Sequence, residues 1–244
     1  MAGKSRVVAR LESEIEKNRA ECNWSRSCDL AKQLSEKSSA LGSLCALVIN
    51  EGKLERYLLD NPPSDKNVQT ARQELADVKK QLVELSKADI KASWNLEATL
   101  LLAEFYLNLE RIEEAQACVL EAGNIFPLSH QVSYMKGRIH EYRQEFSEAK
   151  SCYENAVSIN PGHIKSLQQL AMVLHCMNHS RLAEKVLRDA VNTDPTSSQS
   201  WQYLGQVLHE LGEHEASAEC LATAIDLEGT GPILPFTFIS RVMR

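Results

Sequence analysis

The stretch FSEAKSCYENAVSINP, residues 146–161, recurs along the chain and decides the fold. Copies of it are IEEAQACVLEAGNIFP at 112–127, SRLAEKVLRDAVNTDP at 180–195 and HEASAECLATAIDLEG at 214–229, all spaced by 34 residues. Small residues keep the same spacing in three columns: Ala103, Gly137, Ala171 and Gly205; Ala115, Ala149, Ala183 and Ser217; Ala122, Ala156, Ala190 and Ala224. Agreement at independent positions without an insertion indicates an internal repeat.

Each column has a packing reason. Small residues on two facing helices allow their backbones to approach closely. Larger apolar residues are predicted to fill the seam between the helices: Leu102, Leu170, Leu204, Val119, Tyr153, Leu187 and Leu221. Proline ends the second helix of a unit, because it cannot donate the next hydrogen bond. It stands at Pro127, Pro161 and Pro195, with Gly229 in the fourth place. We therefore interpret Cys152 and Tyr153 as packing residues, not as part of a reactive cluster.

A helix-turn-helix unit of 34 residues resembles the tetratricopeptide repeat. The last unit has that repeat's Trp, Leu and Gly at Trp201, Leu204 and Gly205, whereas Lys136 and Thr99 stand where a leucine and an aromatic residue are usual. The sequence thus predicts an all-α helical-repeat (tetratricopeptide) solenoid with four repeats over residues 96–229.

The remaining residues predict three further segments. Residues 1–60 read as an N-terminal helical segment, with a turn at CNWSRSCD and a third helix that ends at Asn61. Residues 61–95 read as a linker, NPPSDKN, followed by an amphipathic helix. That helix carries the stripe Leu75, Val78, Leu82 and Leu85, which is under two heptads long and so favours an amphipathic helix over a coiled coil.

Residues 230–244 form an apolar C-terminal tail, GTGPILPFTFISRVMR from Gly229 onward. The last seam of a repeat array exposes apolar surface unless something covers it. We predict that the tail covers the last repeat or docks on a partner, and a frayed terminus is the alternative. The residues expected to dock are Ile233, Leu234, Phe236, Phe238 and Ile239.

Composition argues against several classes of function. The net charge of −6 disfavours nucleic acid and anionic membranes as partners, and no apolar run reaches the length of a membrane span.

The seven cysteines show no CxxC pairing, so we expect reduced thiols in a cytoplasmic protein. In HCMNH the two histidines His175 and His179 are separated by a predicted turn near Asn178, which disfavours a metal site. Phosphate-loop and nucleophile-elbow motifs are absent from the sequence. We predict a non-enzyme without a cofactor or metal.

A repeat array offers a concave groove lined by the first helix of each unit. In the tetratricopeptide register the groove positions are Tyr134, Arg138, Gln168, Met172, His175, Gln202, Gln206 and His209. Aromatic, Arg, Met and Gln side chains suit a peptide or helix partner; solvated side chains without a partner are the alternative. The Lys and Asn set with which one subfamily grips chaperone tails is absent.

Two parts of the chain resemble the tetratricopeptide repeat protein 7 family. ARLESEIEKNRAECNWSRSCDLAKQLSEK with EGKLERYLLDNP is similar to its N-terminus, and AQACVLEAGNIFPLSHQVSYMKGRIHE through LAEKVLRDAV to PFTFISRVM is similar to its C-terminus. Family members are longer, and residues near Asp89 join Trp94 where the family has further repeats. The resemblance implies a non-catalytic scaffold that helps to place a phosphatidylinositol 4-kinase (type III alpha) at the plasma membrane. The implied partners are this kinase, a hyccin-type protein and a lipidated membrane anchor protein. A generic peptide-binding repeat module is the alternative function.

Overall fold

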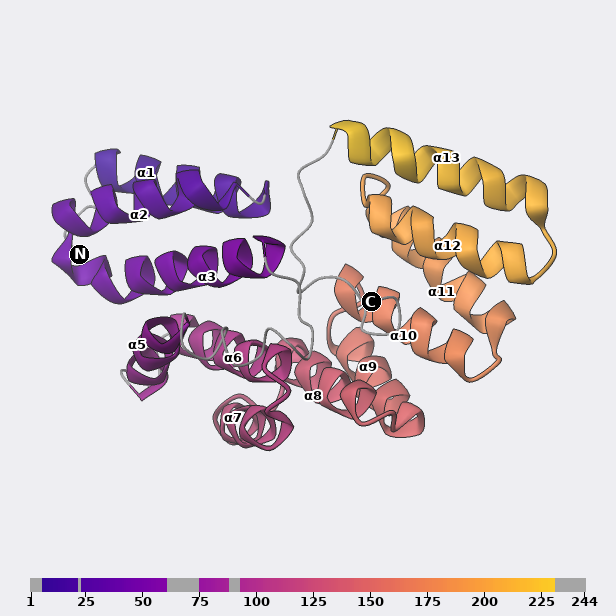
Figure 1. Cartoon of the computed structure of the whole chain (residues 1–244), viewed down its shortest axis with the longest axis horizontal. Helices are drawn as coiled ribbons and strands as arrows, with labels where there is room; N and C mark the ends of the chain where they lie inside the picture. Colours follow the sequence, from indigo (N-terminus) through magenta and orange to yellow (C-terminus); the bar gives the residue numbers. More distant parts are fainter. Residues whose placement is uncertain (1–5, 22, 61–74, 88–92, 231–244) are drawn as a thin grey trace. The chain divides into compact units, whose positions relative to one another are not determined.

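The computed structural model describes residues 6–21, 23–60, 75–87 and 93–230 (Figure 1). These residues form α-helices and one short 3-10 turn, and no strand occurs among them. The prediction of an all-α helical-repeat fold is confirmed. Residues 231–244 of the predicted tail, the whole of the predicted linker NPPSDKN and Asp89 of the predicted junction lie outside the described residues. The prediction that Gly229 ends the last second helix is wrong, because that helix continues to Thr230.

The described residues divide into two compact units, 6–118 and 119–230, and the division falls inside α7. The first unit holds α1 (Arg6–Ala20), α2 (Trp24–Lys37), η1 (Ser39–Leu41), α3 (Gly42–Asp60), α5 (Ala76–Lys87), α6 (Ser93–Asn108) and the start of α7 (Ile112–Ile125). The second holds the end of α7, α8 (His130–Tyr142), α9 (Phe146–Ile159), α10 (Ile164–Cys176), α11 (Ser180–Thr193), α12 (Ser198–Glu210) and α13 (His214–Thr230). The first predicted repeat is therefore shared between the two units.

The core of the first unit begins where α1, α2 and α3 meet. Its buried residues include Leu11 and Ile15 of α1, which follow the helical spacing expected from the sequence. The rest of this cluster comprises Leu30, Ala31, Leu34, Cys45 and Val48, with Val8, Leu41 and Ile49 packed against it. Leu75, Val78, Leu82 and Leu85 are also buried, and α5 packs against α6. The stripe thus behaves as the apolar face of an amphipathic helix.

The predicted turn CNWSRSCD is mostly wrong. The structure starts α2 at Trp24, so that only residues up to Asn23 precede the helix. The Asn23 side chain accepts a hydrogen bond from the backbone N–H of Arg26, which is the geometry of a helix N-cap. Because Trp24, Cys28 and Leu30 are buried, the apolar face of α2 extends through the stretch that its polar residues had marked as a turn.

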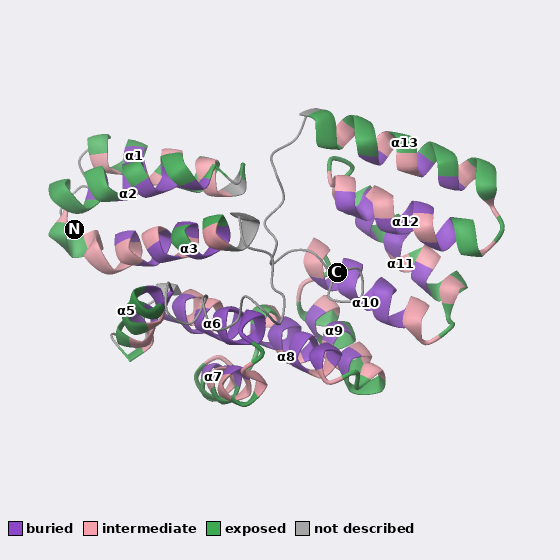
Figure 2. Cartoon of the chain, in the orientation of Figure 1, coloured by how far each residue is buried: buried purple, intermediate pink, exposed green. Residues whose placement is uncertain are grey.

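In the repeats, the small residues of the three columns are all buried. Two of them have no room for a side chain. A β-carbon on Gly137 would lie 2.5 Å from the Tyr153 ring, and one on Gly205 would lie 2.7 Å from Leu221 Cγ. Figure 2 shows buried residues concentrated along α8, α10 and α12. The prediction that these columns mark close helix contacts is confirmed.

The backbone repeats with the same period as the sequence. Glu110, Gln144, Asn178 and Gly212 have positive φ angles of 57°, 60°, 61° and 80°, and they are spaced by 34 residues. The residue after each of them donates its N–H to a carbonyl five positions back: Arg111 to Tyr106, Glu145 to His140, His179 to Leu174 and Glu213 to Leu208. This left-handed C-terminal cap closes the first helix and starts the second in all four predicted repeats. The turn predicted near Asn178 is confirmed.

Candidate partner-binding surface

The eight predicted groove residues lie on α8, α10 and α12, the first helices of three successive repeats in the second unit. Their exposure differs. Tyr134, Arg138, Gln168 and Met172 are buried, His175, Gln202 and Gln206 are half-buried, and His209 is exposed. The groove assignment as a whole stays a prediction. The four residues with accessible surface are the ones that a partner can contact without a rearrangement.

Gln168 has a structural partner set. Its amide Nε2 donates to Ser197 Oγ at 3.1 Å and to Ser200 Oγ at 2.8 Å. Ser197 is the N-cap of α12, and its hydroxyl also accepts from the backbone N–H of Ser200. The amide therefore ties α10 to the first turn of α12, and this contact explains why a polar side chain is buried there.

A polar cluster surrounds Arg138 on α8. Its side chain is only 1% exposed, Nη1 donates to Tyr134 Oη at 3.3 Å, and the guanidinium lies over the Tyr142 ring at 6.0 Å. On the same helix, Glu141 accepts a hydrogen bond of 2.7 Å from the Tyr153 hydroxyl of α9. Burial, together with the Glu141 charge, holds the pKa of Tyr153 well above its usual value. Sequence reasoning identified Tyr153 as a packing residue and gave no sign of its carboxylate partner.

The histidines of HCMNH lie on different helices, as predicted. His175 is in the last turn of α10, and His179 is the N-cap of α11. His175 Nε2 is 3.2 Å from Glu210 Oε1 of α12, and its Nδ1 is 3.3 Å from Ser180 Oγ. Among the described residues, no three His, Cys, Asp or Glu side chains are arranged to hold a metal ion.

The described cysteines form no disulfide: they are Cys28, Cys45, Cys118, Cys152, Cys176 and Cys220. Burial raises the pKa of the Cys152 and Cys176 thiols. A raised pKa keeps a thiol protonated near neutral pH and makes it a poor nucleophile. These two side chains therefore act as small apolar groups within the repeats.

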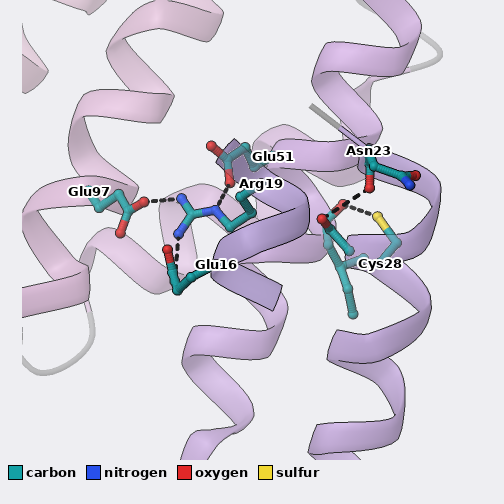
Figure 3. Close-up of polar contacts among 8 residues, drawn as sticks. Glu16, Arg19, Asn23, Cys28, Glu51 and Glu97 are labelled. Atoms are coloured by element: carbon teal, nitrogen blue, oxygen red, sulfur yellow. Dashed lines mark hydrogen bonds and ion pairs between the residues drawn. The ribbon is translucent and has the colours of Figure 1, made fainter. Parts of the chain in front are cut away.

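The first unit contains a second polar cluster, which was not predicted from the sequence (Figure 3). Arg19 of α1 donates to Glu51 of α3 at 2.7 Å and to Glu16 at 3.2 Å, and it also pairs with Glu97 of α6. Its side chain is 13% exposed. Burial opposes the charge of the guanidinium, but the Glu51 and Glu97 carboxylates outweigh that effect and raise the pKa of Arg19. The cluster joins three helices of this unit.

The predicted docking residues of the tail, Ile233, Leu234, Phe236, Phe238 and Ile239, lie outside the described residues. Their role stays a prediction. None of the helices in the described part of the chain combines the length and the apolar character needed to cross a membrane.

Two models of known protein families match parts of this chain. The model described as Tetratricopeptide repeat protein 7 N-terminal matches residues 1–141 in one range. The chain belongs to the tetratricopeptide repeat protein 7 family. The tetratricopeptide repeat model also matches residues 130–163 and 198–230, which are the second and fourth units of the predicted register. The range 1–141 runs across the predicted junction at 89–94, so the omission of middle repeats stays a prediction.

The curated relatives of this family chain are much longer than the stretch they share with it. Tetratricopeptide repeat protein 7B of Homo sapiens is 47% identical over 141 residues, which are 58% of this chain and 17% of that protein. Tetratricopeptide repeat protein 7A of Homo sapiens is 41% identical over 139 residues, which are 57% of this chain and 16% of that protein. The matched stretch thus spans about a sixth of these relatives.

Solved structures show the same fold. A crystal structure of MamA superposes with a TM-score of 0.53 at 17% identity and covers 68% of this chain and 94% of that one. MamA 41-end from Desulfovibrio magneticus RS-1 gives a TM-score of 0.52 at 17% identity, with 76% and 96% covered. At this identity the likeness concerns the helical-repeat fold alone. Family membership and the repeats together support a protein-binding scaffold role for this chain.

Proposed function

We propose that this chain is a non-catalytic scaffold that helps to recruit a phosphatidylinositol 4-kinase complex to the plasma membrane. The observation that carries the proposal is the match of the family's N-terminal model over residues 1–141. The resemblance to that family implies three partners: the kinase of type III alpha, a hyccin-type protein and a lipidated membrane anchor protein. The chain would stay cytoplasmic and reach the membrane peripherally, through these partners.

The surface proposed for a partner is the accessible part of the predicted groove in the second unit. Gln202 and Gln206 are four residues apart on α12, so they lie on one face of the helix. His209 continues that face, and His175 of α10 reaches toward α12 through its contact with Glu210. Half-exposed amides and imidazoles can donate to and accept from the backbone of an extended or helical segment. We therefore place protein recognition on α10 and α12.

The same surface also favours the alternative function, a peptide- or helix-binding repeat module without a connection to lipid kinases. Affinity purification of the tagged chain from cells separates the two. Recovery of the lipid kinase with the hyccin-type protein supports recruitment. Recovery of other proteins without the kinase favours the generic module, provided that the double variant Gln202→Ala with Gln206→Ala recovers less of those proteins. Asn192→Ala, at an exposed polar position of α11, is the matched control. No specific partner for the folded chain would contradict both functions.

A further inference from the structure

The last described helix, α13, exposes an apolar side chain at a position where the two preceding second helices have a more buried one. At the 34-residue spacing, Val157 of α9, Val191 of α11 and Ile225 of α13 are equivalent. Val157 is half-buried and Val191 is 7% exposed, but Ile225 is 67% exposed. The seam residue one turn earlier shows the same trend, because Tyr153 and Leu187 are fully buried and Leu221 is half-buried.

The arrangement of the helices gives the reason. In the second unit α9 packs against both α8 and α10, and α11 packs against both α10 and α12. Among the described helices, α13 packs extensively only against α12. The second helices α9 and α11 therefore each have a following first helix on their far side. The equivalent side of α13 is open, and Ile225 lies on it.

The residues that follow α13 repeat much of the apolar pattern of such a first helix. Positions 232–244 stand 34 residues after α12, which spans Ser198–Glu210. Apolar residues follow five of the seven buried residues of α12 at that spacing: Gln199 by Ile233, Ser200 by Leu234, Leu204 by Phe238, Gly205 by Ile239 and Leu208 by Val242. The other two, Tyr203 and Val207, are followed by Thr237 and Arg241. In a helix of that register Pro232 and Pro235 would stand in the first turn, where backbone N–H groups have no partner within the helix and proline is tolerated.

We infer that the open face of α13 around Ile225 is the docking site for residues 232–244 of the same chain, in the place of the first helix of a next repeat. These residues lie outside the described ones. Only residue 231 separates α13 from residue 232, whereas four residues separate α11 from α12, so docking requires the last turn of α13 to unwind. The connection then matches that of the earlier repeats, and such a short tether gives a segment an effective concentration in the millimolar range, which favours it over a second copy or a separate partner. This inference goes beyond the proposed function and requires no partner.

Photo-crosslinking in the full chain tests the inference directly. Benzoylphenylalanine replaces Ile225, the sample is irradiated, and the crosslinked peptides are identified by mass spectrometry. We expect crosslinks within one chain to peptides from 232–244, with a yield that does not change on dilution. The matched control is benzoylphenylalanine at Leu182, which is 54% exposed on α11 and has Glu148 and Ala216 as its equivalents. Crosslinks between two chains, or the same tail yield from both positions, would overturn the inference.

Thermal unfolding gives an independent readout. Ile225→Ser should lower the melting temperature of the full chain by about 2–4 °C, and it should have no such effect in a chain truncated after Gly231. Leu182→Ser should leave both chains unchanged. An equal shift from Ile225→Ser in both chains would contradict tail docking, as would no shift in the full chain. If the truncated chain does not fold, the crosslinking result decides alone.

Discussion

The ring of Tyr153 occupies the space that a side chain on residue 137 would fill, because a β-carbon on Gly137 would lie 2.5 Å from Tyr153 Cε1. The next repeat has the pair Ala171 and Leu187 at these two positions. In these two repeats the larger residue on the first helix is matched by the smaller one on the second, so the two positions share one volume. The fourth repeat pairs Gly205 with Leu221, which also leaves no room for a β-carbon.

This relationship predicts strong coupling between the two positions. Gly137→Ala should destabilise the chain by roughly 1–3 kcal/mol through overpacking. Tyr153→Leu alone should also destabilise it, because the bond to Glu141 is lost. The double variant, which copies the next repeat, should be more stable than the sum of the single effects allows. Urea unfolding of all four proteins measures the coupling. Strictly additive free energies of unfolding would contradict the contact.

The left-handed turns predict a stabilising substitution. Gln144 has a φ angle of 60°, which is unfavourable for any residue with a β-carbon. Gln144→Gly should therefore raise the free energy of unfolding by about 0.5–1 kcal/mol. The reverse change, Gly212→Ala, should lower it by about 1 kcal/mol, since no atom crowds a β-carbon there and only the backbone conformation matters. Changes of the opposite sign in thermal or urea unfolding would show that the turn differs.

Removal of the Arg19 side chain should lower the free energy of unfolding substantially. Arg19→Ala leaves the half-buried Glu51 without its bond of 2.7 Å. Removing one partner of a buried pair costs about 3–5 kcal/mol, and the remaining exposure of this pair reduces that figure toward about 2 kcal/mol. Arg10→Ala is the control, since Arg10 pairs with Glu14 while its side chain is 80% exposed. Equal losses in urea unfolding of the two variants would contradict a structural role for the cluster.

Protonation of His163 should lower the free energy of unfolding in acid. The imidazole packs edge-on against His130 at 4.8 Å between ring centroids, next to Tyr134, and contacts Ser166 Oγ at 2.7 Å. Burial, with the charges of His130 and Lys165, lowers the pKa of His163 from 6.5 to about 4. The unfolded chain therefore binds a proton at a higher pH than the folded chain does. The contribution of His163 is constant above pH 6.5, and stability falls as the pH drops from there toward 4.

The test compares the pH dependence of urea unfolding in wild type and His163→Asn. Asparagine keeps a side chain that suits the N-cap of α10. The difference between the two proteins should change between pH 6.5 and 4 and stay constant above pH 7. His179→Asn, at the exposed N-cap of α11, controls for the change of cap residue. A difference that does not vary with pH would rule out the proposed burial of the neutral ring.

The fold was predictable because close contacts between helices leave a trace in sequence. Ala149 and Ala156 recur at a fixed spacing, and only small residues allow the same backbone approach. The candidate surface was less predictable. Register alone placed Arg138 and Gln168 in a groove, but their burial depends on Tyr134, Tyr142, Ser197 and Ser200. The Arg19 cluster left no trace, because Glu51 and Glu97 are 32 and 78 residues away in the chain.

We propose that the accessible groove residues on α10 and α12 bind the lipid-kinase complex. The most direct test is calorimetric titration of the purified chain with the purified kinase and hyccin-type protein. We expect saturable binding, and we expect Gln202→Ala with Gln206→Ala to weaken it by roughly tenfold or more, a change of about 1.4 kcal/mol. Asn192→Ala should bind like the wild type. Absence of saturable binding to a well-folded chain, or equal affinities of the two variants, would rule out binding of the complex through these groove residues.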